Sequence, residues 1–176
     1  MKKTIITTFT VFALLGSSVP TSFALTAPGQ YFDLSHWKLT IPGPKEISPE
    51  KLKTYSSKFF YYDNGAMVFW VDSALKGTTP NSKYVRSELR ELIDPKNSKK
   101  NWPTTGTHIM TAEISVKANS VPQITVLQIH GIEKNGDNAP PLLRVAMMNG
   151  DIYAWVKKKD LKTEKILLAE NINGNR

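Results

Sequence analysis

The ten residues from Lys83 to Leu92, KYVRSELREL, place charged side chains at alternate positions. In a β-strand, Arg86, Glu88 and Arg90 would share one face, because successive side chains point to opposite sides. A solvent-exposed strand has the same pattern. Two arginines beside a carboxylate also form a rigid cationic site that can bind an anion. The stretch therefore predicts either an ordinary exposed strand or an anion-binding strand.

A second polar pair, Gln128 and His130, lies in the segment VLQIHG. In a strand these two side chains share a face, whereas Leu127 and Ile129 point to the opposite face, which should be the core. A glutamine amide donates hydrogen bonds to a carboxylate, and histidine transfers protons near neutral pH. Such a pair alone is more often structural. Its occurrence together with the arginine-rich strand favours a site that binds an anion and moves a proton.

Short segments rich in β-branched and aromatic residues dominate the rest of the chain, separated by Gly, Pro and Asn. They predict strands at residues 66–71, 109–116, 124–130, 142–148 and 152–156. Asn149-Gly150 predicts a two-residue hairpin turn, because both residues tolerate positive φ. Only residues 49–57 and 160–168 are candidate short helices. We expect an all-β sandwich or jelly roll, whose concave sheet suits a long polymer.

Composition limits the class of protein and of partner. The chain has 176 residues, of which 40% are hydrophobic, as expected of one globular domain. It has no cysteine, which excludes disulfides, thiolate metal sites and a cysteine nucleophile. Lys and Arg number 23 against 15 acidic residues, a formal charge of +8. This excess favours an anionic partner.

The first 24 residues have the pattern of an export signal. Lys2 and Lys3 form a basic start, an apolar run follows, and Ser22-Phe-Ala24 carries small residues where a signal peptidase cleaves. We expect cleavage after Ala24, a secreted domain of residues 25–176 (extracellular or periplasmic), and a mature charge of +6. Export makes intracellular nucleic acid an unsuitable partner. No apolar run reaches the roughly 18 residues of a membrane span.

Three stretches, in this order, resemble polysaccharide lyase family 7, the alginate lyases: Phe32–Pro42 (FDLSHWKLTIP), Arg86–Glu91 (RSELRE) and Gln128–His130 (QIH). The resemblance begins near Tyr31 and extends to the end of the chain. It implies a monomeric β-jelly roll, similar to the concanavalin sandwich, whose concave groove binds an anionic polysaccharide and cleaves it by β-elimination.

The resemblance also implies roles for single residues. Arg86 and Gln128 would neutralise the carboxylate of a uronate, and His130 would transfer a proton. The scheme requires no metal and no cofactor. Four further residues would contact substrate or hold the donors in register: Arg90, Glu88, Lys83 and Tyr84. Because the third stretch reads Gln-Ile-His, the family pattern favours guluronate over mannuronate.

One block of the family has no match. Near their C-terminus, these enzymes carry a strand of pattern Tyr-Phe-Lys-x-Gly-x-Tyr, whose tyrosine transfers the second proton. None of the six tyrosines of this chain lies in that context. We therefore expect a fragment, truncated at its C-terminus, whose closing strands are missing, and we expect this polypeptide alone to lack lyase activity.

Two other classes of protein share the secretion and the charge. A non-catalytic jelly-roll module that binds polyanionic polysaccharide needs hydrogen-bond donors but no proton-transfer histidine, so Gln128-Ile-His130 argues against it. A basic exported protein that binds nucleic acid or anionic lipid would show clustered Lys and Arg with exposed aromatics or an amphipathic helix. The sequence shows neither pattern.

Overall fold

The structure is a computed structural model that describes residues 25–43, 45–75, 77, 84–98, 100, 102, 105–116, 121–130 and 140–172. The expected signal segment and Lys83 lie outside these residues. Within them, no helix has both the length and the apolar character needed to cross a membrane.

Strands make up nearly all the regular structure. The described residues include two short helical elements, the 3-10 helix η1 (Pro28–Gln30) and α1 (Pro49–Leu52). The strands are β1 (Trp37–Ile41), β2 (Lys45–Ile47), β3 (Phe60–Asp63), β4 (Ala66–Phe69), β5 (Glu88–Glu91), β6 (Gln123–Ile129), β7 (Leu143–Met148), β8 (Asp151–Lys157) and β9 (Thr163–Ala169). The expectation of an all-β protein is confirmed.

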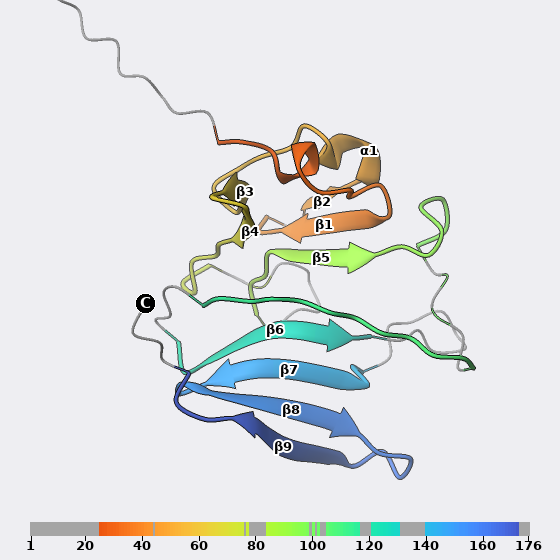
Figure 1. Cartoon of the computed structure of the whole chain (residues 1–176), viewed down its shortest axis with the longest axis vertical. Coiled ribbons are helices and arrows are strands. Elements are labelled where there is room, and N and C mark those ends of the chain that lie inside the picture. The colour runs from red at the N-terminus through yellow and green to blue at the C-terminus, as the bar shows by residue number, and fades with distance from the viewer. Residues whose placement is uncertain are drawn as a thin grey trace, which may run out of the picture.

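The strands form three antiparallel sheets, with orders β2-β1-β5, β3-β4 and β6-β7-β8-β9. In Figure 1, β5 and β6 occupy the middle of the molecule, with β1 and β2 beyond β5 and with β7, β8 and β9 beyond β6. The arginine-rich strand and the histidine strand thus form the facing edges of two sheets.

The buried core lies under the three-stranded sheet. Along β1, Leu39 and Ile41 are almost fully buried, whereas Lys38 and Thr40 alternate with them on the other face. Leu39 and Ile41 pack with Leu34, Ile47, Leu52 and Phe60, and Leu89 of β5 joins this cluster. The burial of Leu89 fixes the orientation of β5, so that Glu88 and Arg90 must point away from the core.

The hairpin between β7 and β8 is as expected. Asn149 and Gly150 have φ of 53° and 91°, the positive values that a tight two-residue turn requires. This turn sets the register in which Met148 lies opposite Asp151 and Arg144 lies opposite Trp155.

Two predicted elements are wrong. Residues 109–116 do not form a strand: they have no ladder partner, and Ile109 is 78% exposed. The strand propensity of β-branched residues reflects how well their side chains pack on a sheet surface. A segment with no neighbouring strand to pair with therefore does not become a strand. In Figure 1 the segment runs between β5 and β6.

Residues 160–168 do not form a helix either. Lys158 and Lys162 close a turn through a backbone hydrogen bond of 2.9 Å, and β9 then pairs with β8. This region lacks the apolar stripe that would hold a short helix against a core, and the edge of β8 offers backbone partners instead.

Candidate functional site

The arginine-rich strand has one core face and one polar face. Leu89 pairs with Leu39 in the core, and the Ser87 hydroxyl donates a 2.7 Å hydrogen bond to the carbonyl of Phe59. Arg86, Glu88 and Arg90 are all half-buried on the opposite side. The period-two interpretation of this segment is therefore confirmed.

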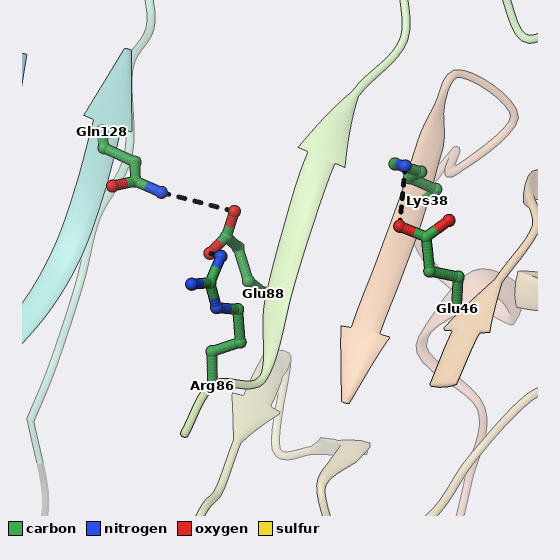
Figure 2. Close-up of polar contacts among 5 residues, drawn as sticks. All are labelled: Lys38, Glu46, Arg86, Glu88 and Gln128. Atoms are coloured by element: carbon green, nitrogen blue, oxygen red, sulfur yellow. Dashed lines mark hydrogen bonds and ion pairs between the residues drawn. The ribbon is translucent and has the colours of Figure 1, made fainter. Parts of the chain in front are cut away.

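Glu88 joins β5 to β6. Its Oε2 lies 3.4 Å from Nη1 of Arg86, and its Oε1 accepts a hydrogen bond of 3.4 Å from Nε2 of Gln128. Figure 2 shows the three side chains pointing toward one another, Gln128 from β6 and the other two from the β5 segment. Forty positions separate Glu88 and Gln128 in sequence, so the fold has brought together two predicted site residues.

The contacts of this cluster are long and partly exposed. Both distances lie at the far end of the hydrogen-bonding range, and the side chains of Arg86 and Glu88 are 36% and 26% exposed. Contacts of this kind contribute little to stability, typically less than about 1 kcal/mol. The contacts of Arg86 and Gln128 with Glu88 can therefore be replaced by contacts with another anion at small cost.

His130 directly follows the last residue of β6 and is half-buried. It stands two positions beyond Gln128, and Ile129, between them, receives a 2.9 Å hydrogen bond at its carbonyl from the backbone of Leu142. Backbone pairing thus continues to the position just before the histidine. His130, the predicted proton-transfer residue, therefore lies at the same end of β6 as Gln128. Arg86 and Gln128, the two residues predicted to neutralise a carboxylate, together form the predicted clamp.

The other predicted binding residues have different surroundings. Arg90 lies opposite Lys38 in the β1–β5 ladder, and Lys38 Nζ is held 2.8 Å from Glu46 Oε1. This second ion pair is drawn in Figure 2. Glu46 offsets the repulsion between the two facing cations. Tyr84 is 70% exposed, and it lies outside the strands.

Lys38 and Glu46 were not among the residues predicted from the sequence. Lys38 does occur in the first stretch of the family resemblance, directly after Trp37. Glu46 follows the turn after β1 and belongs to no recognised stretch. The carboxylate of Glu46 reaches the polar face beside Lys38 and Arg90 only because β1 pairs with β2 on one side and with β5 on the other.

The other two histidines have structural contacts. The Nδ1 of His36 lies 3.2 Å from the carbonyl oxygen of Leu92. His108 contacts the carbonyl oxygen of Thr105 at 3.1 Å and stacks on Trp102 with a centroid separation of 5.0 Å. Among the three histidines, only His130 directly follows the strand that carries Gln128.

The site is an open polar face. Of two shallow hollows in the described part of the chain, one is lined by Lys38, Glu46 and Leu92 and the other by Lys58 and Trp70, among other residues. Arg86, Glu88 and Gln128 line neither of these two hollows. In the same part of the chain, no group of His, Asp and Glu has the arrangement needed to hold a metal ion.

Comparisons with known proteins agree with the fold. A family model described as alginate lyase matches residues 32–175. An alginate lyase of Klebsiella pneumoniae is 38% identical over a segment that covers 43% of this chain and 28% of that enzyme.

Two solved structures of alginate lyase A1-II′ are also similar. One, a complex with substrate (GGMG), is 39% identical, with a TM-score of 0.71, and the match covers 84% of this chain and 67% of that one. The other, described as a member of polysaccharide lyase family 7, is 41% identical with a TM-score of 0.69, over 82% of this chain and 66% of that one.

These matches, with the antiparallel sheets described above, define the fold as a β-jelly roll, as expected. The chain belongs to the alginate lyases of polysaccharide lyase family 7. It spans about two thirds of the length of the similar solved structures and 28% of the K. pneumoniae enzyme.

Proposed function

We propose that this protein is an exported alginate lyase, with a signal peptide at residues 1–24 and a jelly-roll domain from residue 25, and that together with the family's C-terminal tyrosine block it cleaves alginate by β-elimination. The observation that carries the proposal is the meeting of Arg86, Glu88 and Gln128 from two separate strands, at the end of β6 where His130 follows. Family membership supports the choice of substrate and reaction.

The first requirement of the reaction is control of charge. A uronate carries a carboxylate on C5, and removal of the C5 proton adds negative charge to that group. Preorganised donors stabilise such developing charge most when they need no rearrangement during the reaction. We assign this role to the Arg86 guanidinium and the Gln128 amide, with Glu88 holding both donors before substrate arrives.

The second requirement is a pair of proton transfers. A base removes the C5 proton, the electrons of that bond form the C4–C5 double bond, and the bond from C4 to the leaving oxygen breaks. That oxygen then takes a proton from an acid. We assign one transfer to His130. The other belongs to the tyrosine that the family carries in its C-terminal block, for which residues 1–176 offer no match.

The test compares two proteins. One is the polypeptide of residues 25–176, and the other is the same polypeptide extended by the tyrosine-bearing block of a family member. We expect both to bind alginate and the extended protein alone to release products that absorb ultraviolet light through the new double bond. Folding of both is checked by circular dichroism. New reducing ends without this absorbance would mean hydrolysis and would contradict the proposal.

We further propose a preference for guluronate, on the basis of the family pattern Gln-Ile-His at residues 128–130. The extended protein should turn over polyguluronate faster than polymannuronate at equal uronate concentration. The measurement is the initial rate of absorbance increase on each homopolymer. Faster turnover of polymannuronate would show that the preference is wrong.

A further inference from the structure

The face of the four-stranded sheet that carries Gln128 also carries a line of side chains in register with it. Gln128 of β6 lies opposite Arg144 of β7, Arg144 lies opposite Trp155 of β8, and Trp155 lies opposite Lys165 of β9. Residues directly opposite each other in antiparallel strands point to the same face. The uronate clamp therefore continues into a row that crosses the whole sheet.

Aromatic rings hold the two cations of this row. Cζ of Arg144 lies 4.4 Å from the ring centroid of Trp155. Nζ of Lys165 lies 5.6 Å from the same centroid and 3.8 Å from that of Tyr153. Cation–π contacts limit the motion of both side chains while leaving their charges available.

The row lies on a cationic face. Within β7, β8 and β9 this face carries three cations, Arg144, Lys157 and Lys165, and one carboxylate, Asp151. Asp151 accepts hydrogen bonds from the Tyr153 hydroxyl at 3.3 Å and from the backbone N–H of Asn171 at 3.0 Å. These hydrogen bonds partly offset the negative charge of Asp151, which is the first residue of β8.

The opposite face is apolar in its centre. Val145 of β7 lies opposite Ala154 of β8, and Ala154 lies opposite Ile166 of β9. The single carboxylate of β9, Glu164, lies opposite Val156 in the ladder. It therefore belongs to this second face, where it forms an ion pair of 2.9 Å with Lys158. The cationic charge is therefore concentrated on the side of the sheet that carries Gln128.

We propose that Arg144 and Lys165 form a distal subsite that binds further carboxylates of the same polyuronate chain, on a path from Gln128 across β7 and β8 to β9. Adjacent strands are about 4.8 Å apart, so Lys165 lies about 14 Å from Gln128 across the sheet. A pyranose unit is about as long as one strand spacing, which places Lys165 about three sugars from the clamp. The inference rests on the proposed function.

The row also has a purely structural interpretation, in which the cations only cover aromatic rings on an exposed sheet. Chain length separates the two interpretations. A subsite three sugars away contacts a tetrasaccharide and cannot contact a disaccharide held at the clamp. A structural or long-range electrostatic effect acts on both ligands.

The experiment measures binding of saturated di- and tetraguluronate to the mature chain by calorimetry, for four proteins: wild type, Lys165→Gln, Arg86→Ala and Lys58→Gln. Lys58 is the matched control, because it also lies over aromatic rings, Phe59 at 5.1 Å and Trp70 at 5.8 Å, and belongs to neither sheet of the site. We expect Lys165→Gln to weaken tetrasaccharide binding about tenfold, as for loss of one charged hydrogen bond, and to leave disaccharide binding unchanged.

Each outcome decides one of the two proposals. Equal effects of Lys165→Gln on both ligands, or no effect on either, would overturn the distal subsite. If Arg86→Ala weakens the binding of both ligands while Lys165→Gln weakens neither, the proposed clamp is supported and the distal subsite is wrong. If Lys165→Gln weakens binding of the tetrasaccharide while Arg86→Ala changes nothing, the row binds polyuronate independently and the proposed lyase site is wrong.

A second pair of variants tests Arg144 in the same way. Arg144→Lys, which keeps the charge, should retain more affinity for the tetrasaccharide than Arg144→Gln.

Discussion

Replacement of His130 by glutamine in the extended protein is expected to lower the turnover number on alginate by about 10² to 10⁴, the usual contribution of a general acid or base. Glutamine keeps a polar side chain of similar reach and cannot transfer a proton near neutral pH. The substrate should still bind, because Arg86 and Gln128 remain. The loss should therefore fall on kcat, with little change in KM.

The matched control for this variant is His108→Gln. His108 stacks on Trp102 and contacts the carbonyl of Thr105. Its replacement should leave the turnover number within a few-fold of the starting enzyme. Initial rates over a range of alginate concentrations measure both variants. If His130→Gln retained the full turnover number, proton transfer would belong to another residue.

The clamp variants Arg86→Ala and Gln128→Ala are each expected to lower turnover by about two to three orders of magnitude, the scale observed for removal of one preorganised donor. Binding should weaken less than the rate falls, because the charge on the carboxylate is greatest in the transition state. The double variant should lose less than the product of the two single losses, since Glu88 couples both donors in the free protein.

Gln123→Ala is the control for the clamp. Gln123 begins the strand that carries Gln128 and lies opposite Met148, five positions from the site. Its loss should not change kcat. Weakened binding with unchanged kcat in both clamp variants would make Arg86 and Gln128 simple groove contacts, and the alternative of a non-catalytic binding module would gain support.

Local alternation was enough to predict the faces of β5 and the face of β6 that carries Gln128. Leu127 and Ile129 of β6, which were expected to face the core, are only half-buried, and neither joins the buried core around Leu39. Leu89 packs in the core, and Gln128 contacts Glu88 on the polar face, because a period of two assigns each side chain once the strand is recognised. The hairpin at Asn149-Gly150 was predicted for the same reason, since its backbone requirement is confined to two residues.

Pairing between distant strands was not visible in the sequence. The contact of Gln128 with Glu88 spans 40 positions, and the alignment of Arg144 with Trp155 and Lys165 depends on the registers of two ladders. Trp155 has apolar neighbours in sequence, yet it lies half-buried on the polar face beneath Arg144. The alternation of side chains shows that a strand has two faces. Which of the two faces is buried depends on the elements that pack against the strand.

The same limit explains the two incorrect elements. Residues 109–116 have the composition of a strand without a partner, and residues 163–169 become a strand because β8 offers an unpaired edge. Both outcomes depend on neighbours far along the chain or in space. Propensity alone does not contain that information.

The most direct measurement of the central claim is a crystal structure of the His130→Gln variant of the mature chain with bound tetraguluronate. One uronate carboxylate should lie within hydrogen-bonding distance of both the Arg86 guanidinium and the Gln128 amide, with C5 of that sugar facing residue 130. A tetrasaccharide bound elsewhere on the protein, or bound here with its carboxylate turned away from Arg86 and Gln128, would contradict the central claim.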